Sequence, residues 1–315
     1  MGRSSHVSFS SSQPRAFTLI ELLVVVAIIG LLISILLPSL KQAREQAHMA
    51  VCIANLRSVG QAMHGYFSDH RDWFPFEKQN WPPSGNPGNF PLTAFYYGGH
   101  PGRPGWAPFE PRFRTTFRGR PFNPYLFDAD GLYDQIETPQ QALSPEGNER
   151  RKAMSVYFCP SDEGGFYNTD TSADTNFDFP VHHGWGASYD INYHFVWLWA
   201  SSSPGGIHRP YPRSNGERRV YLERANRFLA RQRDHNVSRF VVLYEDPFDS
   251  AQWNNLPRFG WHKLWNKHSF LFLDAHAANV FADPTHGNFG PAWKTASGEW
   301  YFDPTDPDYE YRELD

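Results

Sequence analysis

The apolar segment from Phe17 to Leu37 contains a single charged residue, Glu21. A carboxylate inside a membrane costs about 3 kcal/mol or more, so such a residue usually has a partner and a function. A helix of this length is roughly 30 Å long, which matches the hydrocarbon core of a bilayer. Two interpretations follow. Glu21 either reaches the headgroups from the end of a membrane helix, or pairs with a cation inside a bundle of helices.

The residues in front of this segment suggest where such a cation comes from. Residues 1–16 are polar, contain Arg3 and Arg15, and have no acidic residue. If the chain is cut between Ala16 and Phe17, the new α-amino group of one subunit can pair with Glu21 of its neighbour. That pairing would neutralise both charges and fix the stagger between subunits. The two arginines favour a cytoplasmic N-terminus and an exported C-terminal part.

The stretch RAFTLIELLVVVAIIG, residues 15–30, resembles the prepilin cleavage and methylation motif of type IV pilins and type II secretion pseudopilins. The resemblance implies that a prepilin peptidase cuts before Phe17 and methylates its amine, and that Glu21 is the assembly carboxylate. Gly30 and Pro38 stand where this family has residues that soften the helix. Ala16 stands where the family usually has Gly.

The resemblance implies a structural subunit of a pilus-like filament or a secretion pseudopilus, and not an enzyme. Its expected location is the bacterial inner membrane, crossed once, with the C-terminal domain in the periplasm or outside the cell. Its expected partners are prepilin peptidase, other pilin or pseudopilin subunits, and the membrane itself. The net charge of −4 gives no overall polycation, so no specific nucleic-acid partner is expected.

Further segments are similar to a large bacterial group with a prepilin-type N-terminus and a C-terminal element described as H-X9-DG. They are CIANL at 52–56, CPSD at 159–162, Ser188-Tyr189 with Asn192, and a late hairpin rich in His and Asp. The C-terminal element departs from the pattern. Leu264 stands where the His is expected, with His262 and His268 nearby, and Ala275 replaces the Gly after Asp274.

The chain has only two cysteines, Cys52 and Cys159. In an oxidising exported compartment they can form one disulfide, which would tie a strand end to the long helix. Closing a loop of about a hundred residues would stabilise the fold by at most about 4 to 5 kcal/mol. The alternative is two buried free thiols.

Fourteen histidines raise the question of a metal site. His268 and His276 are the candidates, with the two rings facing each other across a hairpin and Asp274 orienting one of them. The chain has no His-Glu-x-x-His or Cys-x-x-Cys pair, so hydrogen-bonded structural histidines are the favoured interpretation and no resident cofactor is expected. Asp128, Asp130 and Asp134 resemble part of a calcium loop, but the remaining ligands of an EF-hand are missing.

Eight arginines and no lysine lie between Arg209 and Arg233. Arg218, Arg219, Arg227 and Arg231 are the candidates for an anion-binding helix face. The alternative is a solvated helix face, which is the more common origin of such a charge run. If the face binds a ligand, the protein is a membrane-anchored binding module for glycan or another anionic polymer. An anchored metal-dependent hydrolase is a third, less favoured reading.

Helical and strand periodicities predict the elements that carry these residues. One helix is expected from about Phe17 to Phe67, with a transmembrane part over 17–38 and a continuation over 39–70. Two stripes run along the continuation. The small one consists of Ala43, Ala47, Ala50 and Ala54, and the large apolar one of Cys52, Leu56, Val59, Met63, Tyr66 and Phe67.

The exported domain is expected over 71–315, with short strands at 156–162, 187–193 and 240–247 and a hairpin over 269–281. Residues 75–124 are so rich in Pro, Gly and aromatic residues that a long surface loop is predicted there. The fold class is therefore α+β, a long N-terminal helix packed on an antiparallel sheet.

Overall fold

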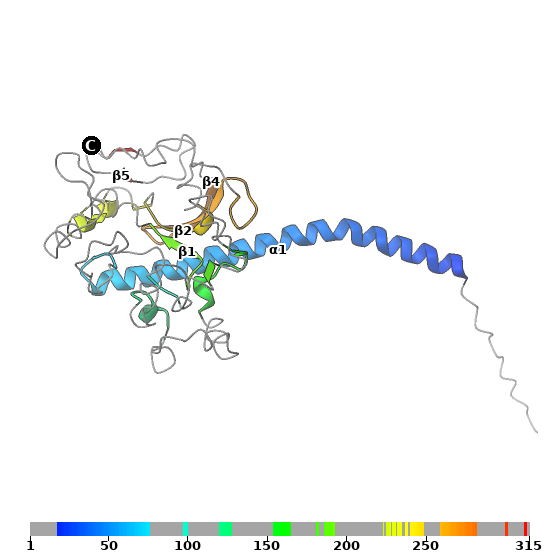
Figure 1. Ribbon diagram of the computed structural model, residues 1–315, viewed down its shortest axis with the longest axis horizontal. Helices are drawn as coiled ribbons and strands as arrows, with labels where there is room; N and C mark the ends of the chain where they lie inside the picture. The colour runs from blue at the N-terminus through cyan, green and yellow to red at the C-terminus, as the bar shows by residue number, and fades with distance from the viewer. Residues whose placement is uncertain are drawn as a thin grey trace, which may run out of the picture. The chain divides into compact units, whose positions relative to one another are not determined.

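The computed structural model describes residues 18–75, 97–99, 120–127, 154–164, 181–182, 186–192, 240–248 and 259–281, with parts of 223–238 and two short C-terminal strands. The chain forms two compact units, residues 1–45 and 46–315. Helix α1, Leu19–Asp69, contributes to both of them (Figure 1).

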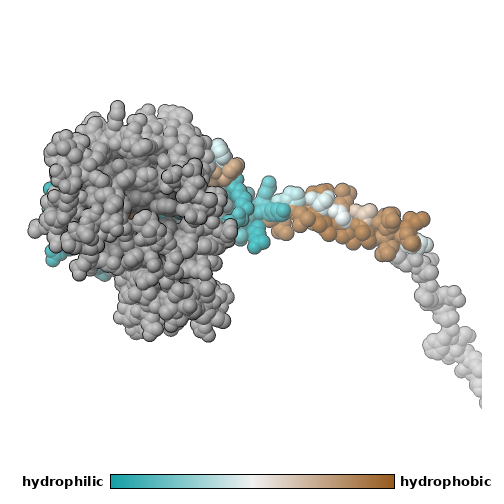
Figure 2. Space-filling model, viewed as in Figure 1, coloured by the Kyte–Doolittle hydropathy of each residue, from teal (hydrophilic) through white to brown (hydrophobic). Residues whose placement is uncertain are grey.

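The first part of α1 is apolar on every side. Its large side chains from Leu19 to Leu40 are exposed, and the segment is long and apolar enough to cross a membrane. On the face of the helix in view, Figure 2 shows apolar side chains along this part, followed by hydrophilic ones further along it. A helix that is hydrophobic all round needs an apolar surrounding. The helix continues through Pro38 and ends close to the predicted position.

The second part of α1 is amphipathic. The predicted large apolar stripe is confirmed, because all six of its members are buried. Gly60 lies in the same buried face, where a Cβ atom would come within 2.8 Å of the Cβ of Ala275 and 2.9 Å of Leu271 Cδ1. The predicted stripe of small residues is exposed.

Four antiparallel strands form the main sheet, in the order β1-β2-β3-β4. They are β1 Tyr189–Ile191, β2 Val241–Glu245, β3 Lys267–Phe272 and β4 Ala277–Phe281. The β2–β3 register shifts between Val241 and Leu243, so the ladder is irregular there. Strands β3 and β4 form the predicted hairpin, whose turn contains Ala275 with a positive φ of 67°. A second, two-stranded sheet pairs β5 Trp300–Tyr301 with β6 Arg312–Glu313. The predicted α+β class is confirmed.

One predicted strand is wrong. Residues 156–162 begin with a 3-10 turn, η3 Ser155–Tyr157, instead of a strand. The Asn55 side chain donates to the carbonyls of Ser155 and Phe158, so the helix takes the hydrogen bonds that a neighbouring strand would need. Pro160 also has no N–H to give to a ladder. A second 3-10 turn, η2, spans Asn123–Tyr125.

Apolar side chains bury both faces of the main sheet. The larger core joins the amphipathic part of α1 to one face and includes Leu56, Val59, Leu243 and Leu271. A smaller cluster covers the opposite face and consists of Val241, Tyr244, Phe248, Phe270 and Phe272. Because both faces are covered, polar residues on these strands need partners inside the protein.

Candidate assembly site and cysteine–histidine cluster

The N-terminus of α1 is a capping box formed by Thr18 and Glu21. The Thr18 backbone N–H and hydroxyl both donate to Glu21 Oε2 at 2.8 Å, and the Glu21 N–H donates back to the Thr18 hydroxyl at 3.3 Å. This reciprocal arrangement satisfies donors that a helix start otherwise leaves unpaired. Within one chain, Glu21 is therefore a helix cap, and both residues are exposed.

The other residues of the predicted assembly site are Ala16, Phe17, Gly30 and Pro38. Ala16 and Phe17 lie outside the described residues. No neighbouring atom comes within 4 Å of a Cβ placed at Gly30, so this glycine leaves open space on the helix. Pro38 lies within the helix, and the Ser39 hydroxyl donates to the Leu36 carbonyl next to it.

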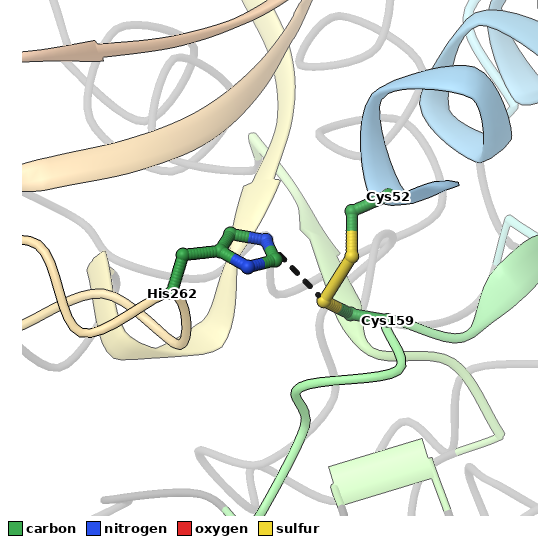
Figure 3. Close-up of side chains that lie close together, drawn as sticks. All are labelled: Cys52, Cys159 and His262. Carbon is green, nitrogen blue, oxygen red and sulfur yellow. Dashed lines mark hydrogen bonds between the residues drawn. A yellow bond between two sulfur atoms is a disulfide. The ribbon is translucent and has the colours of Figure 1, made fainter. Parts of the chain in front are cut away.

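Cys52, Cys159 and His262 meet in the interior of the second unit. The structure joins the two sulfur atoms in a disulfide, with the Cα atoms 5.1 Å apart. His262 Nε2 lies 3.6 Å from Cys159 Sγ. Figure 3 shows the His262 ring directed at the sulfur atom of Cys159. All three side chains are buried. Their ligating atoms lie within 4.8 Å of one another, although the three residues come from distant parts of the chain.

Asp162 fixes the loop that carries Cys159. Its carboxylate accepts hydrogen bonds from the backbone N–H groups of Gly164, Val181 and His182 and from the Ser188 hydroxyl. Ser188 in turn accepts the N–H of Cys159 at 3.1 Å. A carboxylate with several backbone donors orders the segments that supply them. The CPSD stretch thus holds a bridging cysteine in place.

Ser188, Asp162 and His182 are close together but are not arranged as a nucleophilic triad. Both the Ser188 hydroxyl and His182 Nδ1 bind the same carboxylate oxygen, at 2.6 and 2.9 Å. Ser188 Oγ is 3.5 Å from His182 Nδ1. In a triad the histidine lies between the serine and the acid and takes the serine proton. Here the Asp162 carboxylate lies between the serine and the histidine. The three residues therefore serve to hold the loop together and are not arranged to activate the serine.

The predicted pairing of His268 with His276 is wrong. In the hairpin register His268 stands opposite Val280, whereas His276 lies in the turn and pairs with Asp274. His268 is fully buried and its Nδ1 lies 2.8 Å from Glu245 Oε1, which is also buried. The Trp261 N–H donates to the same oxygen at 3.3 Å. His268 and His276 cannot face each other, because His268 lies near the start of β3 and His276 lies in the turn that follows the end of β3.

Sequence reasoning missed the Glu245–His268 pair and the hub role of Asp162. Glu245 lies inside the predicted strand over 240–247, but the sequence analysis gave it no role of its own. The only signal in the sequence was a charged residue directly after a run of buried apolar residues. Its partner lies 23 residues away and is brought to it by strand pairing.

The anion-binding candidates are described only in part. Arg227 is exposed and lies in a helical segment, while Arg218, Arg219 and Arg231 lie outside the described residues. Arg233, from the same run, packs over the Phe67 ring at 4.2 Å and pairs with Asp72 at 3.3 Å. The calcium-loop candidates Asp128, Asp130 and Asp134 also lie outside the described residues, as does most of the predicted loop over 75–124.

Comparisons with known proteins agree with the sequence patterns. A family model described as "Prokaryotic N-terminal methylation motif" matches residues 12–37. A second model, described as "Protein of unknown function (DUF1559)", matches residues 41–207, just over half of the chain. No curated protein and no solved structure matches the chain. The chain therefore belongs to the DUF1559 family and is a type IV pilin-like protein with a prepilin-type methylation motif.

Proposed function

We propose that the protein is a structural subunit of a type IV pilus-like filament or of a type II secretion pseudopilus. In this proposal a prepilin peptidase removes residues 1–16, and the α-amino group of Phe17 in one subunit pairs with Glu21 of the next. The observation that supports it most is the position of Glu21, the single charged residue in the exposed apolar segment over 17–37, which also carries the prepilin motif.

Charge and solvation explain why this pairing would hold subunits together. In a bilayer an unpaired carboxylate costs about 3 kcal/mol or more, and an unpaired ammonium costs a similar amount. Subunits that bring the two together remove both costs. The exposed small residues Ala47, Ala50 and Ala54 allow neighbouring helices to approach closely above the membrane.

The proposed location is the inner membrane, with residues 46–315 exported. The arginines of the leader favour a cytoplasmic N-terminus, and a Cys52–Cys159 bridge suits an oxidising compartment. The binding-module alternative has less support, because Arg233, which ends the arginine run containing the four candidates, contacts Phe67 and Asp72 within the fold.

The test compares three substitutions in the full chain in its native membrane. Gln also serves at the third position of a capping box, so Glu21→Gln keeps the cap and removes the charge. Glu21→Ala removes both, and Glu45→Gln removes a charge from α1 outside the apolar segment. We expect both Glu21 variants to insert normally but to be absent from sheared filament or cross-linked oligomer fractions, with Glu45→Gln unchanged. Normal assembly of Glu21→Gln would show that Glu21 acts only as a cap.

A further inference from the structure

The cluster of Cys52, Cys159 and His262 includes a histidine that a disulfide does not need. A buried bridge is stable without an imidazole beside it, yet His262 directs Nε2 at Cys159 Sγ from a separate turn of the chain (Figure 3). When the bridge is open, the same three residues present two thiols and one ring nitrogen. Two sulfur ligands and one histidine are a donor set that zinc prefers.

The distance between the histidine nitrogen and the cysteine sulfur matches the distance expected in a tetrahedral zinc site. Zinc binds thiolate sulfur at about 2.3 Å and imidazole nitrogen at about 2.0–2.1 Å in a tetrahedron, so the sulfur and nitrogen lie about 3.6 Å apart. The His262 Nε2 to Cys159 Sγ distance is 3.6 Å. Two zinc-bound sulfurs lie about 3.8 Å apart by the same geometry. Side-chain rotation on Cα atoms 5.1 Å apart can supply that separation once the bridge is open.

The charge and the burial of the three side chains also favour a zinc ion. Two thiolates in a fully buried site would be strongly unfavourable alone, because desolvation disfavours the charged forms. A divalent cation with two thiolates and a neutral imidazole is neutral overall, whereas a monovalent ion would leave a net negative charge. The exposed fractions are 0% for Cys52 and 3% each for Cys159 and His262.

The ligands are also held by the fold before any ion arrives. Cys52 lies on α1, and Cys159 is fixed through Ser188 and Asp162. His262 lies in a tight turn closed by the Lys263 N–H to Gly260 carbonyl bond, and its neighbour Trp261 is bound to Glu245. Ligands on three separate, hydrogen-bonded segments need little reorganisation to bind.

We propose that Cys52, Cys159 and His262 form a zinc site while the cysteines are reduced, and that closing the disulfide expels the ion. The newly made chain has both thiols, and zinc binding displaces their two protons. A protein disulfide then oxidises the site: the two cysteine sulfurs lose two electrons and join, the oxidant's two sulfurs become thiols by taking up two protons, and Zn²⁺ leaves. Three protein ligands leave the fourth position of the tetrahedron for water.

The experiment uses the full chain in detergent, kept reduced with a phosphine throughout expression and purification. The phosphine reduces any bridge by giving two electrons, which pass with two protons to the sulfurs, while it takes the oxygen of a water molecule. We expect about one zinc per chain in the reduced protein and none after oxidation. Cobalt(II) substitution should give the intense charge-transfer absorption of a thiolate-bound ion, which histidine sites elsewhere on the surface cannot produce.

Variants then assign the third ligand. His262→Ala and His262→Gln should each weaken zinc binding at least about tenfold, the low end of what even an outer-shell change costs. The matched control is His276→Ala, which removes an exposed ring paired with Asp274 and should leave zinc binding unchanged. The Gln variant keeps a polar side chain at a buried position, in case Ala fails to fold. No thiolate charge-transfer band in the reduced chain, or equal zinc affinity in both His262 variants and the wild type, would overturn the proposal.

Discussion

At the scale of single residues, the buried polar groups are paired across long sequence distances. Glu245 and His268 are both completely buried and bind each other through one oxygen and one nitrogen. The second oxygen of Glu245 and the second ring nitrogen of His268 have no hydrogen-bond partner within the described part of the chain. Removing one member of such a pair leaves the other charged or polar group uncompensated in the interior.

Glu245→Ala should therefore destabilise the unit over residues 46–315 by about 3–5 kcal/mol. Glu245→Gln should cost less, because its amide oxygen can still accept from His268 and from the Trp261 N–H. The measurement is denaturant unfolding followed by circular dichroism. Glu163→Gln is the matched control. It breaks an exposed pair with Lys263 at 3.0 Å, which should matter by less than about 1 kcal/mol. Equal effects of Glu245→Ala and Glu163→Gln would contradict the importance assigned to the buried pair.

At the scale of elements, α1 and the turn of the β3–β4 hairpin pack so closely that each limits the size of the side chains the other can carry. Gly60 of the helix faces the turn residue Ala275, and a Cβ on Gly60 would come within 2.8 Å of the Ala275 Cβ and 3.1 Å of its Cα. Ala275 itself has a φ of 67°, in the left-handed region that favours glycine. Glycine at position 275 would adopt this turn without that strain.

Ala275→Gly should stabilise the domain by about 1 kcal/mol, because glycine adopts the left-handed turn without the Cβ penalty. Gly60→Ala alone should destabilise it by about 1–3 kcal/mol through overpacking. In the double variant, Gly60→Ala should cost less, since the Cβ it would meet is gone. A double-mutant cycle by thermal or denaturant unfolding measures this coupling. Strictly additive effects would show that the two positions do not touch.

How much of this could be read from the sequence differs from element to element. The helix and its buried stripe follow from local periodicity, and the hairpin follows from two strand-like runs around Asp274-Ala-His276, so both were predictable. Residues 156–162 look like a strand because several of them are apolar, but Asn55, about a hundred residues away, donates to the carbonyl of Phe158 and to that of Ser155 just before them. The partners of Asp162 and Glu245 are likewise set by tertiary contacts. Long-range pairing leaves no periodic signal, which is why these groups were missed.

At the scale of the whole molecule, tyrosine hydroxyls connect the long helix, the sheet and the loops within the unit over residues 46–315. The Tyr97 hydroxyl donates to the Tyr189 carbonyl at 2.8 Å, and the Tyr125 hydroxyl donates to Asp69 at the end of α1. Burial raises the pKa of Tyr97, Tyr157 and Tyr189 well above its ordinary value. For Tyr125, burial and the hydrogen bond to Asp69 raise the pKa to about 12.

These shifts predict alkaline unfolding. The folded protein keeps tyrosine protons that the unfolded chain releases near pH 10, so the folded state binds more protons above that pH. The stabilisation is fully present below about pH 10 and falls as the pH rises further. Tyrosinate absorbance and circular dichroism should change together, with part of the absorbance rising only on unfolding. Tyr97→Phe should make the free energy of unfolding fall less steeply with pH above pH 10, by the equivalent of up to one proton released on unfolding. Complete tyrosine ionisation in a still folded chain would contradict this.

For the whole chain in its membrane, we propose a pilin-like subunit whose α-amine is freed by cleavage and pairs with Glu21 of a neighbouring subunit. The most direct measurement is mass spectrometry of the N-terminus of the protein isolated from native membranes. We expect a chain that begins at Phe17 and carries one methyl group on its α-amine. A chain that keeps residues 1–16 would contradict it, because no free amine would then exist at the position where Glu21 needs its partner.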